Sequence, residues 1–130
     1  LEASSILENA RLLEEERARQ RLEKELELAR TIQESLLPRQ LPSGGFMAVA
    51  GSSIPTHQVG GDFYDVIPRP GGGYLATVAD VSGKGVAAAL LASLLQGVLM
   101  EAAAAGTPMA EWLARLNRFL LERTEGEKYC

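Results

Sequence analysis

The chain has 130 residues, a formal net charge of −4 and a hydrophobic share of 46%. That length allows one modest domain with an extension, and the apolar share is sufficient for a core. The negative balance leaves no basic stripe, which argues against nucleic acid as the main partner. A single cysteine, Cys130, and the absence of a signal-peptide pattern are features expected of a cytoplasmic protein.

Residues 2–36 contain no glycine or proline and are rich in Glu, Arg, Leu and Ala, which predicts one long helix. Some of its residues follow the 4-3-4-3 spacing of a coiled-coil seam, namely Leu22, Leu26, Ala29, Gln33 and Leu36. A second seam runs in another register through Ile6, Ala10 and Leu13. Polar residues separate the two seams, so we expect a stutter. A parallel homodimeric connector is the favoured interpretation, and a solvated helix docked on its own domain is the alternative.

Composition changes after this helix. Residues 1–36 hold nine of the seventeen acidic residues, whereas the remainder is richer in glycine and alanine. Prolines and glycines interrupt the boundary at residues 38–45. We therefore expect a linker helix over residues 1–37, a connector over 38–45 and a second part over 46–130.

The second part begins with strand patterns. An apolar run at residues 46–54 predicts a strand ended by Pro55. Residues 62–67 and 74–81 predict a β-hairpin, because a loop rich in proline and glycine separates them. His57 stands alone in a loop without a second ligand nearby, so we interpret it as a surface histidine or one with its hydrogen bonds satisfied.

All three aspartates of the chain lie in or beside this hairpin. Strand alternation places Asp62 and Asp80 on one face and directly opposite each other, with Cβ atoms about 5 Å apart. Two carboxylates at that distance repel each other unless a cation or a proton lies between them. Asp65 falls on the other face with Phe63 and Ile67, which indicates a structural role.

Two helices are predicted after the hairpin. The first covers residues 86–100, carries no charge, is capped by Ser82 and is too short to span a membrane. Gly106 ends it, and Thr107 followed by Pro108 predicts the start of the second helix. The second helix has an apolar face on which Trp112 is expected to be core. Residues 127–130 have the pattern of a further strand.

Two nucleotide-binding interpretations fail on spacing. The phosphate-binding loop requires a Ser or Thr after its lysine, but Gly85 follows Lys84. The run Gly60-Gly61-Asp62-Phe63 also resembles a diguanylate cyclase motif, yet the chain lacks room upstream for that family's substrate-binding elements. A divalent-cation site is the remaining interpretation, since hard ions such as Mg²⁺ or Mn²⁺ prefer oxygen ligands. Aspartates that merely end two strands are the alternative.

The runs Gln58–Asp65 and Ala79–Gly85 together resemble the sporulation-stage-II-E type serine/threonine phosphatases of the metal-dependent protein phosphatase (PPM) superfamily. Residues 29–38 resemble the regulatory linker helix that precedes the catalytic domain in such proteins. Residues 6–12 resemble the exit helix of a GAF sensor domain.

This resemblance implies an α+β fold, the N-terminal portion of a PPM-type α-β-β-α sandwich preceded by a long coiled-coil helix. It implies two Mn²⁺ or Mg²⁺ ions, with Asp80 bridging them, the main-chain carbonyl of Val81 adding a ligand and Asp62 serving the second ion. The implied substrate is a phosphoserine or phosphothreonine on an anti-sigma-factor antagonist, under the control of an upstream sensor.

Two features depart from the superfamily's pattern. Eukaryotic members carry a histidine after the bridging aspartate, where this chain has Ser82 and Lys84, so we assign no general acid. The aspartates that complete the family's first metal site would lie beyond Cys130, so the chain alone is expected to be inactive. A non-enzymatic alternative is a dimerising signalling module, or a phosphatase-like domain that has lost catalysis.

Overall fold

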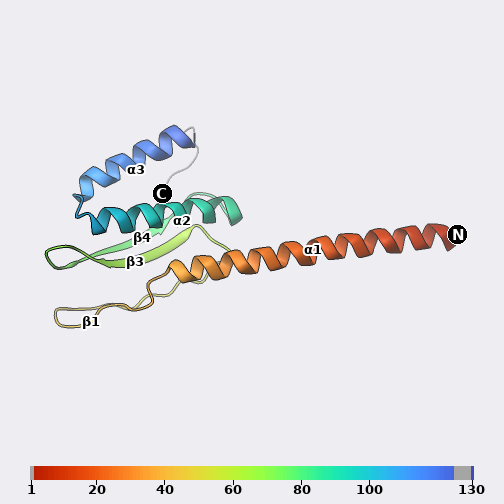
Figure 1. Cartoon of the computed structure of the whole chain (residues 1–130), viewed down its shortest axis with the longest axis horizontal. Helices are drawn as coiled ribbons and strands as arrows, with labels where there is room; N and C mark the ends of the chain where they lie inside the picture. The colour runs from red at the N-terminus through yellow and green to blue at the C-terminus, as the bar shows by residue number, and fades with distance from the viewer. Residues whose placement is uncertain (1, 125–129) are drawn as a thin grey trace.

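The computed structural model describes residues 2–124 and residue 130. Its elements, in chain order, are α1 (Glu2–Leu36), β1 (Ser43–Gly44), β2 (Met47–Ala48), β3 (Asp62–Pro68), β4 (Tyr74–Asp80), α2 (Gly85–Ala104) and α3 (Met109–Arg123). Most of α1 projects away from a small layered body formed by the other elements (Figure 1). The α+β class and the long N-terminal helix predicted from the sequence are confirmed.

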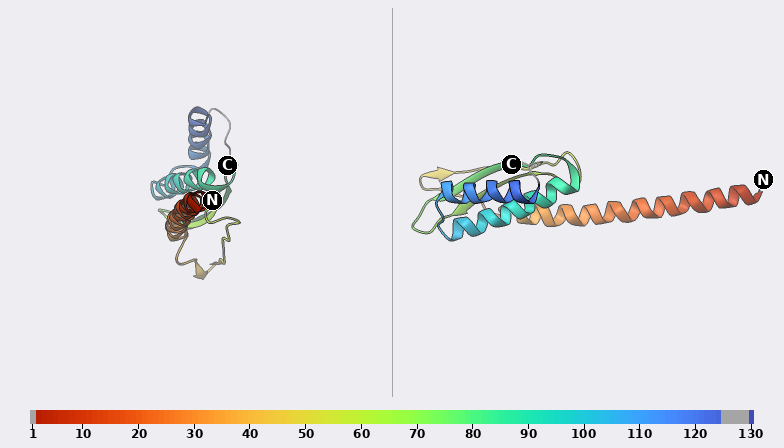
Figure 2. Two further views of the ribbon diagram at one scale, coloured as in Figure 1. Left: turned by 90° about the vertical axis from the view of Figure 1, so that its right-hand side faces the viewer. Right: turned by 90° about the horizontal axis from the view of Figure 1, so that it is seen from above.

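The body is a stack of layers. Figure 2 shows α3 on the outside, then α2, then the hairpin of β3 and β4, with the segment that carries β1 and β2 on the opposite side. The C-terminal end of α1 lies beside α2. The core lies between α2 and the hairpin, so one face of the hairpin is buried, while the other borders a hollow towards residues 49–54.

None of the 35 residues of α1 is buried. Its polar surface is tied by short-range ion pairs, such as the one between Arg19 and Glu16 at 2.8 Å. Large apolar side chains remain exposed along it, namely Ile6, Leu7, Leu12, Leu13, Leu22, Leu28 and Ile32. Only the C-terminal end docks on the body, and the coiled coil stays a prediction.

The predicted hairpin is confirmed in position and register. β3 and β4 pair antiparallel, with Asp62 opposite Asp80 at the open end and Pro68 opposite Tyr74 at the turn. The turn contains three consecutive glycines, 71–73, with φ values of 84°, 101° and 83°. Residues with side chains rarely adopt these angles, which explains the glycine run in the sequence.

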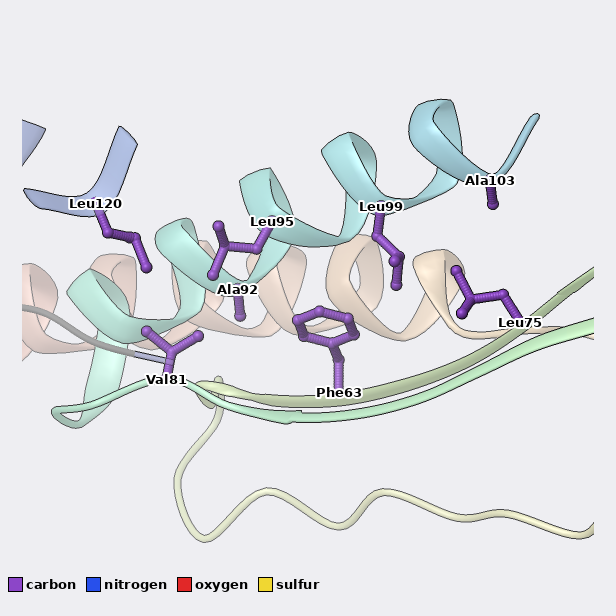
Figure 3. Packing of buried hydrophobic residues seen from close by; sticks show 8 residues of the cluster. All are labelled: Phe63, Leu75, Val81, Ala92, Leu95, Leu99, Ala103 and Leu120. Carbon is purple, nitrogen blue, oxygen red and sulfur yellow. The ribbon is translucent and has the colours of Figure 1, made fainter. Parts of the chain in front are cut away.

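The core forms where the hairpin meets the two helices (Figure 3). Apolar side chains point from the hairpin towards side chains of α2, and α3 contributes one residue from its last turn. The members of this cluster are Phe63, Leu75, Val81, Ala92, Leu95, Leu99, Ala103 and Leu120. Trp112 is half-buried and packs against the cluster, so its predicted place at the core holds in part.

Helix α2 is longer than predicted. It has 20 residues, enough by length and apolar composition to cross a membrane, which the predicted span of 86–100 did not reach. Its buried residues nevertheless lie on the face that packs against the hairpin, and a core helix of this kind meets the same criteria.

The strand predicted at residues 46–54 is wrong for most of its length. Only Met47 and Ala48 are in a strand, paired with Gly44 and Ser43 respectively. The Val49 amide donates to the Pro42 carbonyl at 2.9 Å, and residues 49–54 have no ladder partner in the described part of the chain. An apolar run forms a strand only where a neighbouring strand can satisfy its backbone.

Both predicted helix caps are displaced. Helix α2 begins at Gly85 with Lys84 as its N-cap, because the turn at Gly83, with φ 103°, separates Ser82 from the helix. Pro108, rather than Thr107, is the N-cap of α3. The Thr107 amide instead donates to the Ala102 carbonyl at 3.0 Å, which keeps Thr107 in the closing turn of α2. The strand predicted at residues 127–130 lies outside the described residues except for Cys130, which is in no strand.

The core predicts a clear contrast between two leucines of α2. Leu95 is 2% exposed and Leu90 is 68% exposed. We expect Leu95→Ala to lower the free energy of unfolding by about 2–5 kcal/mol, because it leaves a cavity in the core. Leu90→Ala should change it by no more than about 0.5 kcal/mol. Urea denaturation of the two variants measures both effects, and equal losses would contradict the described packing.

Candidate functional site

The predicted carboxylate pair is present at the open end of the hairpin. Asp62 is the first residue of β3 and Asp80 the last residue of β4, and they are direct partners in the register. Both residues are exposed, and strand alternation puts them on the face opposite Phe63, which points towards α2 (Figure 3). Val78, on the same face, is 89% exposed. The sheet therefore presents two like charges side by side on an open surface.

Electrostatics at the pair follow from this geometry. The pKa of the Asp62 carboxyl is raised above its ordinary value, first by partial burial, then by the negative charge of Asp80 and by a hydrogen bond with it. A raised carboxyl pKa means that the charged form of Asp62 is less favourable in the folded chain than in water. A cation between the two aspartates would remove the same repulsion.

Asp65 has the structural role predicted for it. It is 5% exposed, its Oδ1 accepts a hydrogen bond from the Val66 amide at 2.8 Å and its Oδ2 accepts one from Gln96 Nε2 at 3.3 Å. Gln96 is 2% exposed and also donates to the Leu36 carbonyl at 2.8 Å. Asp65 and Gln96 therefore join the hairpin, α2 and the end of α1.

Gly61 approaches the end of β4 closely. The Val81 amide donates to the Gly61 carbonyl at 3.2 Å. A Cβ atom on Gly61 would lie 2.8 Å from the Val81 carbonyl oxygen and 3.1 Å from the Ala88 Cβ. No side chain fits at position 61 without moving Val81, whose carbonyl is the backbone ligand implied by the family resemblance.

Gln33 makes a paired contact with the loop before Asp62. Its Nε2 donates to the Gly60 carbonyl at 2.6 Å, and its Oε1 accepts a hydrogen bond from the Gly60 amide at 3.0 Å. Sequence reasoning placed Gln33 in a coiled-coil seam and missed this contact. A glutamine at an apolar seam position of a helix was the one signal in the sequence that could have indicated it.

Two hollows border the site. One, of about 200 Å³, lies between the end of α1, the loop before β3 and the start of α2, and its lining includes Arg30, His57 and Lys84. The other, of about 570 Å³, lies between residues 49–54 and the carboxylate face of the hairpin. At the second hollow, the Tyr64 hydroxyl donates a hydrogen bond to the Gly51 carbonyl at 3.0 Å and so links β3 to the facing loop. His57 is exposed, as predicted.

The donor set is suited in kind to a hard divalent cation, but it is small. Two carboxylates and one neighbouring carbonyl offer oxygen atoms, the ligands that Mg²⁺ and Mn²⁺ prefer. No cluster of three or more His, Cys, Asp or Glu side chains that could hold a metal occurs among residues 2–124 and 130. The roles of Asp62, Asp80 and Val81 as ligands therefore stay predictions.

Cys130 is a further neighbour of the site that the sequence did not indicate. Partial burial raises the pKa of its thiol, a hydrogen bond with the Asp80 backbone lowers it, and the charge of Asp80 raises it again. The residue itself is exposed and forms no disulfide. The Cys130 thiol thus lies beside the end of β4.

Comparisons with known proteins agree with the resemblance seen in the sequence. Residues 70–130 match the family described as Stage II sporulation protein E (SpoIIE), a range that includes Asp80 and Val81 but not Asp62. Over 110 residues the chain is 27% identical to the phosphoserine phosphatase RsbU of Bacillus subtilis (strain 168). No solved structure matches the chain.

Residues 70–130 are thus similar to the SpoIIE family, and most of the chain is similar to RsbU. The predicted family resemblance is thereby confirmed. The alignment with RsbU covers 85% of this chain and 32% of RsbU. The chain therefore spans about a third of the length of the curated relative that it matches.

The raised pKa of Asp62 predicts that stability depends on pH. The folded chain holds the Asp62 proton more tightly than the unfolded chain. Protonation of Asp62 therefore stabilises the folded chain, and this stabilisation is fully present below the ordinary carboxyl pKa. It is lost as the pH rises through the raised pKa. We expect Asp62→Asn to flatten this part of the stability profile and Glu101→Gln, an exposed carboxylate on α2, to leave it unchanged. Thermal unfolding from pH 3 to 7 measures the profile, and an unaltered slope in Asp62→Asn would count against the close carboxylate pair.

Proposed function

We propose that the chain comprises the linker helix and the N-terminal portion of the catalytic domain of a metal-dependent protein serine/threonine phosphatase. The observation that carries the proposal is the opposed pair of Asp62 and Asp80 within a chain whose residues 70–130 are similar to the SpoIIE family. Asp80 and the Val81 carbonyl would hold Mn²⁺ or Mg²⁺, and Asp62 would serve a second ion. When bound, such ions supply positive charge that stabilises a phosphoryl group during attack by water.

The residues of this chain position the two carboxylates and the Val81 carbonyl. β-pairing keeps the two carboxylates opposite each other, so little conformational freedom is lost when a cation binds. Gly61 brings the backbone before Asp62 close to the Val81 carbonyl, and the core beneath keeps β3 and β4 from separating. Because two carboxylates and one carbonyl leave an incomplete site, we expect the 130 residues alone to be inactive.

The substrate class follows from the same relationship. The relative RsbU is named a phosphoserine phosphatase. We propose a phosphoserine or phosphothreonine on a regulatory protein of the anti-sigma-factor-antagonist type, acted on in the cytoplasm. The proposal includes control by an upstream sensor domain of GAF type and a homodimer formed through α1.

A non-catalytic role is the second candidate. It is favoured by α1, whose 35 residues include none that is buried and many apolar ones that are exposed. A helix of this kind suits a dimerising signalling module even if the phosphatase-like part has lost catalysis. The two candidates differ in whether phosphate release depends on Asp80.

Catalysis is tested by Asp80→Asn in the longer protein that we propose contains this chain. Changing a residue that only supports a metal ligand costs about 10–100-fold in affinity or activity, so losing a direct ligand should cost about 100-fold or more. Phosphate release from a phosphorylated antagonist protein is measured with and without Mn²⁺. Glu101→Gln is the matched control and should retain the full rate. An unchanged rate in Asp80→Asn would exclude the metal role of Asp80 and favour the non-catalytic candidate.

Dimerisation is tested on residues 1–45 by sedimentation equilibrium at tens of micromolar. We expect a dimer, because association would cover apolar side chains such as Leu22, which is 56% exposed. Leu22→Lys should shift the equilibrium towards monomer, whereas Arg21→Lys should not. A monomeric wild-type segment would contradict the proposed coiled coil.

A further inference from the structure

We propose that Gln33 is a positioning residue for the carboxylate site, holding the backbone at Gly60 and thereby the placement of Asp62. The inference rests on the proposed function, because it assumes that Asp62 and Asp80 bind a divalent cation. It begins from one contact, between the last turns of α1 and the loop that precedes β3.

The contact satisfies both backbone groups of one residue. Gln33 Nε2 donates to the Gly60 carbonyl at 2.6 Å, and the Gly60 amide donates to Gln33 Oε1 at 3.0 Å. The side-chain amide thus bonds to Gly60 as a neighbouring strand would. Glutamine is suited to this contact because its amide carries a donor and an acceptor in one plane. Glutamate would keep the acceptor and lose the donor, and methionine would lose both.

The loop that Gln33 holds needs such ties. Gly60 and Gly61 lack side chains that would restrict their backbone, so contacts from outside must fix it. Gly61 is held on one side, since its carbonyl accepts the Val81 amide at 3.2 Å. Gln33 holds Gly60 on the other side, and Asp62 follows directly. The two ties together fix the backbone that leads into the carboxylate pair.

Gln33 is itself held in place. One turn further along α1, the Leu36 carbonyl accepts a hydrogen bond from the buried Gln96 side chain at 2.8 Å. Gln96 also binds Asp65 on β3, and Leu37 packs against the core. The end of α1 is therefore anchored to the hairpin through Gln96. The helix turn that carries Gln33 is thus held in position relative to the loop that Gln33 contacts.

A purely structural role for Gln33 makes a different prediction from a positioning role. If Gln33 only docked α1 on the body, its loss would lower stability and leave the cation response of the carboxylates unchanged. If it positions Asp62, its loss must weaken cation binding at residues that it does not touch. The decisive readout is therefore the Mn²⁺ concentration required at the site, separate from unfolding.

The experiment uses the full 130-residue chain, with Gln33→Met and Gln33→Glu as variants. Gln20→Met is the matched control, because the Gln20 side chain is exposed on α1 and donates to Glu16 of the same helix at 2.9 Å. Amide exchange at Gly60 reports the contact itself. Broadening of the backbone amide signals of residues 61–63 and 79–82 during titration with Mn²⁺ reports the site.

We expect faster exchange at Gly60 in Gln33→Met, and at least a tenfold increase in the Mn²⁺ needed for half-maximal broadening, the lower end of the range for residues that support metal ligands. Gln33→Glu should show the same increase, so the inference remains testable if Gln33→Met does not fold. Gln20→Met should behave as the wild-type chain.

Two results would overturn the inference, and they are distinguishable. If the wild-type chain broadens with Mn²⁺ and both Gln33 variants broaden at the same concentration, the positioning role is wrong while the metal site stands. If the wild-type chain shows no broadening at these residues, Asp62 and Asp80 bind no Mn²⁺ in this chain and the positioning role of Gln33 is wrong, whereas the proposed phosphatase function is tested separately by Asp80→Asn in the longer protein.

Discussion

Packing of α2 against one face of the β3–β4 hairpin is the interaction on which the site depends. Phe63 and Val81 point into the space that Ala92 and Leu95 enter from the helix. Because side chains alternate along a strand, burying Phe63 fixes Asp62 on the opposite, open face. The same packing fixes the strand register, which places Asp80 directly across from Asp62. The carboxylate pair is therefore a consequence of the core beneath it.

This arrangement has an electrostatic cost, because two like charges lie directly opposite each other. Partial burial and the opposed carboxylate of Asp80 raise the pKa of Asp62, and a cation between the two carboxylates would relieve their repulsion. The glycines before Asp62 allow the backbone to approach the end of β4, where a Cβ atom on Gly61 would collide with the Val81 carbonyl. Like charges, a close backbone approach and a loop held by hydrogen bonds occur together at one place. A surface patch without a function would not require this combination.

Helix α1 has two stretches with different surroundings. Over most of its length it carries exposed apolar side chains that suit association with another helix. Its last turns instead contact the body through Gln33 and Leu37, and through the Leu36 carbonyl bonded to Gln96. The last turns of α1 therefore dock on the chain's own domain, which was the alternative interpretation from the sequence, whereas the dimeric connector stays a proposal for the rest of the helix. The contact between α1 and the loop before Asp62 connects the upstream part of the chain to the carboxylate site.

The sequence alone determined the long helix, the hairpin, the opposition of Asp62 to Asp80 and the structural place of Asp65, because local composition and strand alternation are sufficient for each. Two short motifs also indicated the family resemblance with which the comparisons agree. The sequence could not determine that residues 49–54 form no strand, since a strand depends on a partner far away in the chain. It placed the starts of α2 and α3 at the wrong residues, because the turns at Gly83 and Thr107 depend on backbone contacts. The roles of Gln33, Gln96 and Gly61 were decided only by the tertiary structure, since each depends on groups between 20 and 60 residues away that folding brings within hydrogen-bond or van der Waals distance.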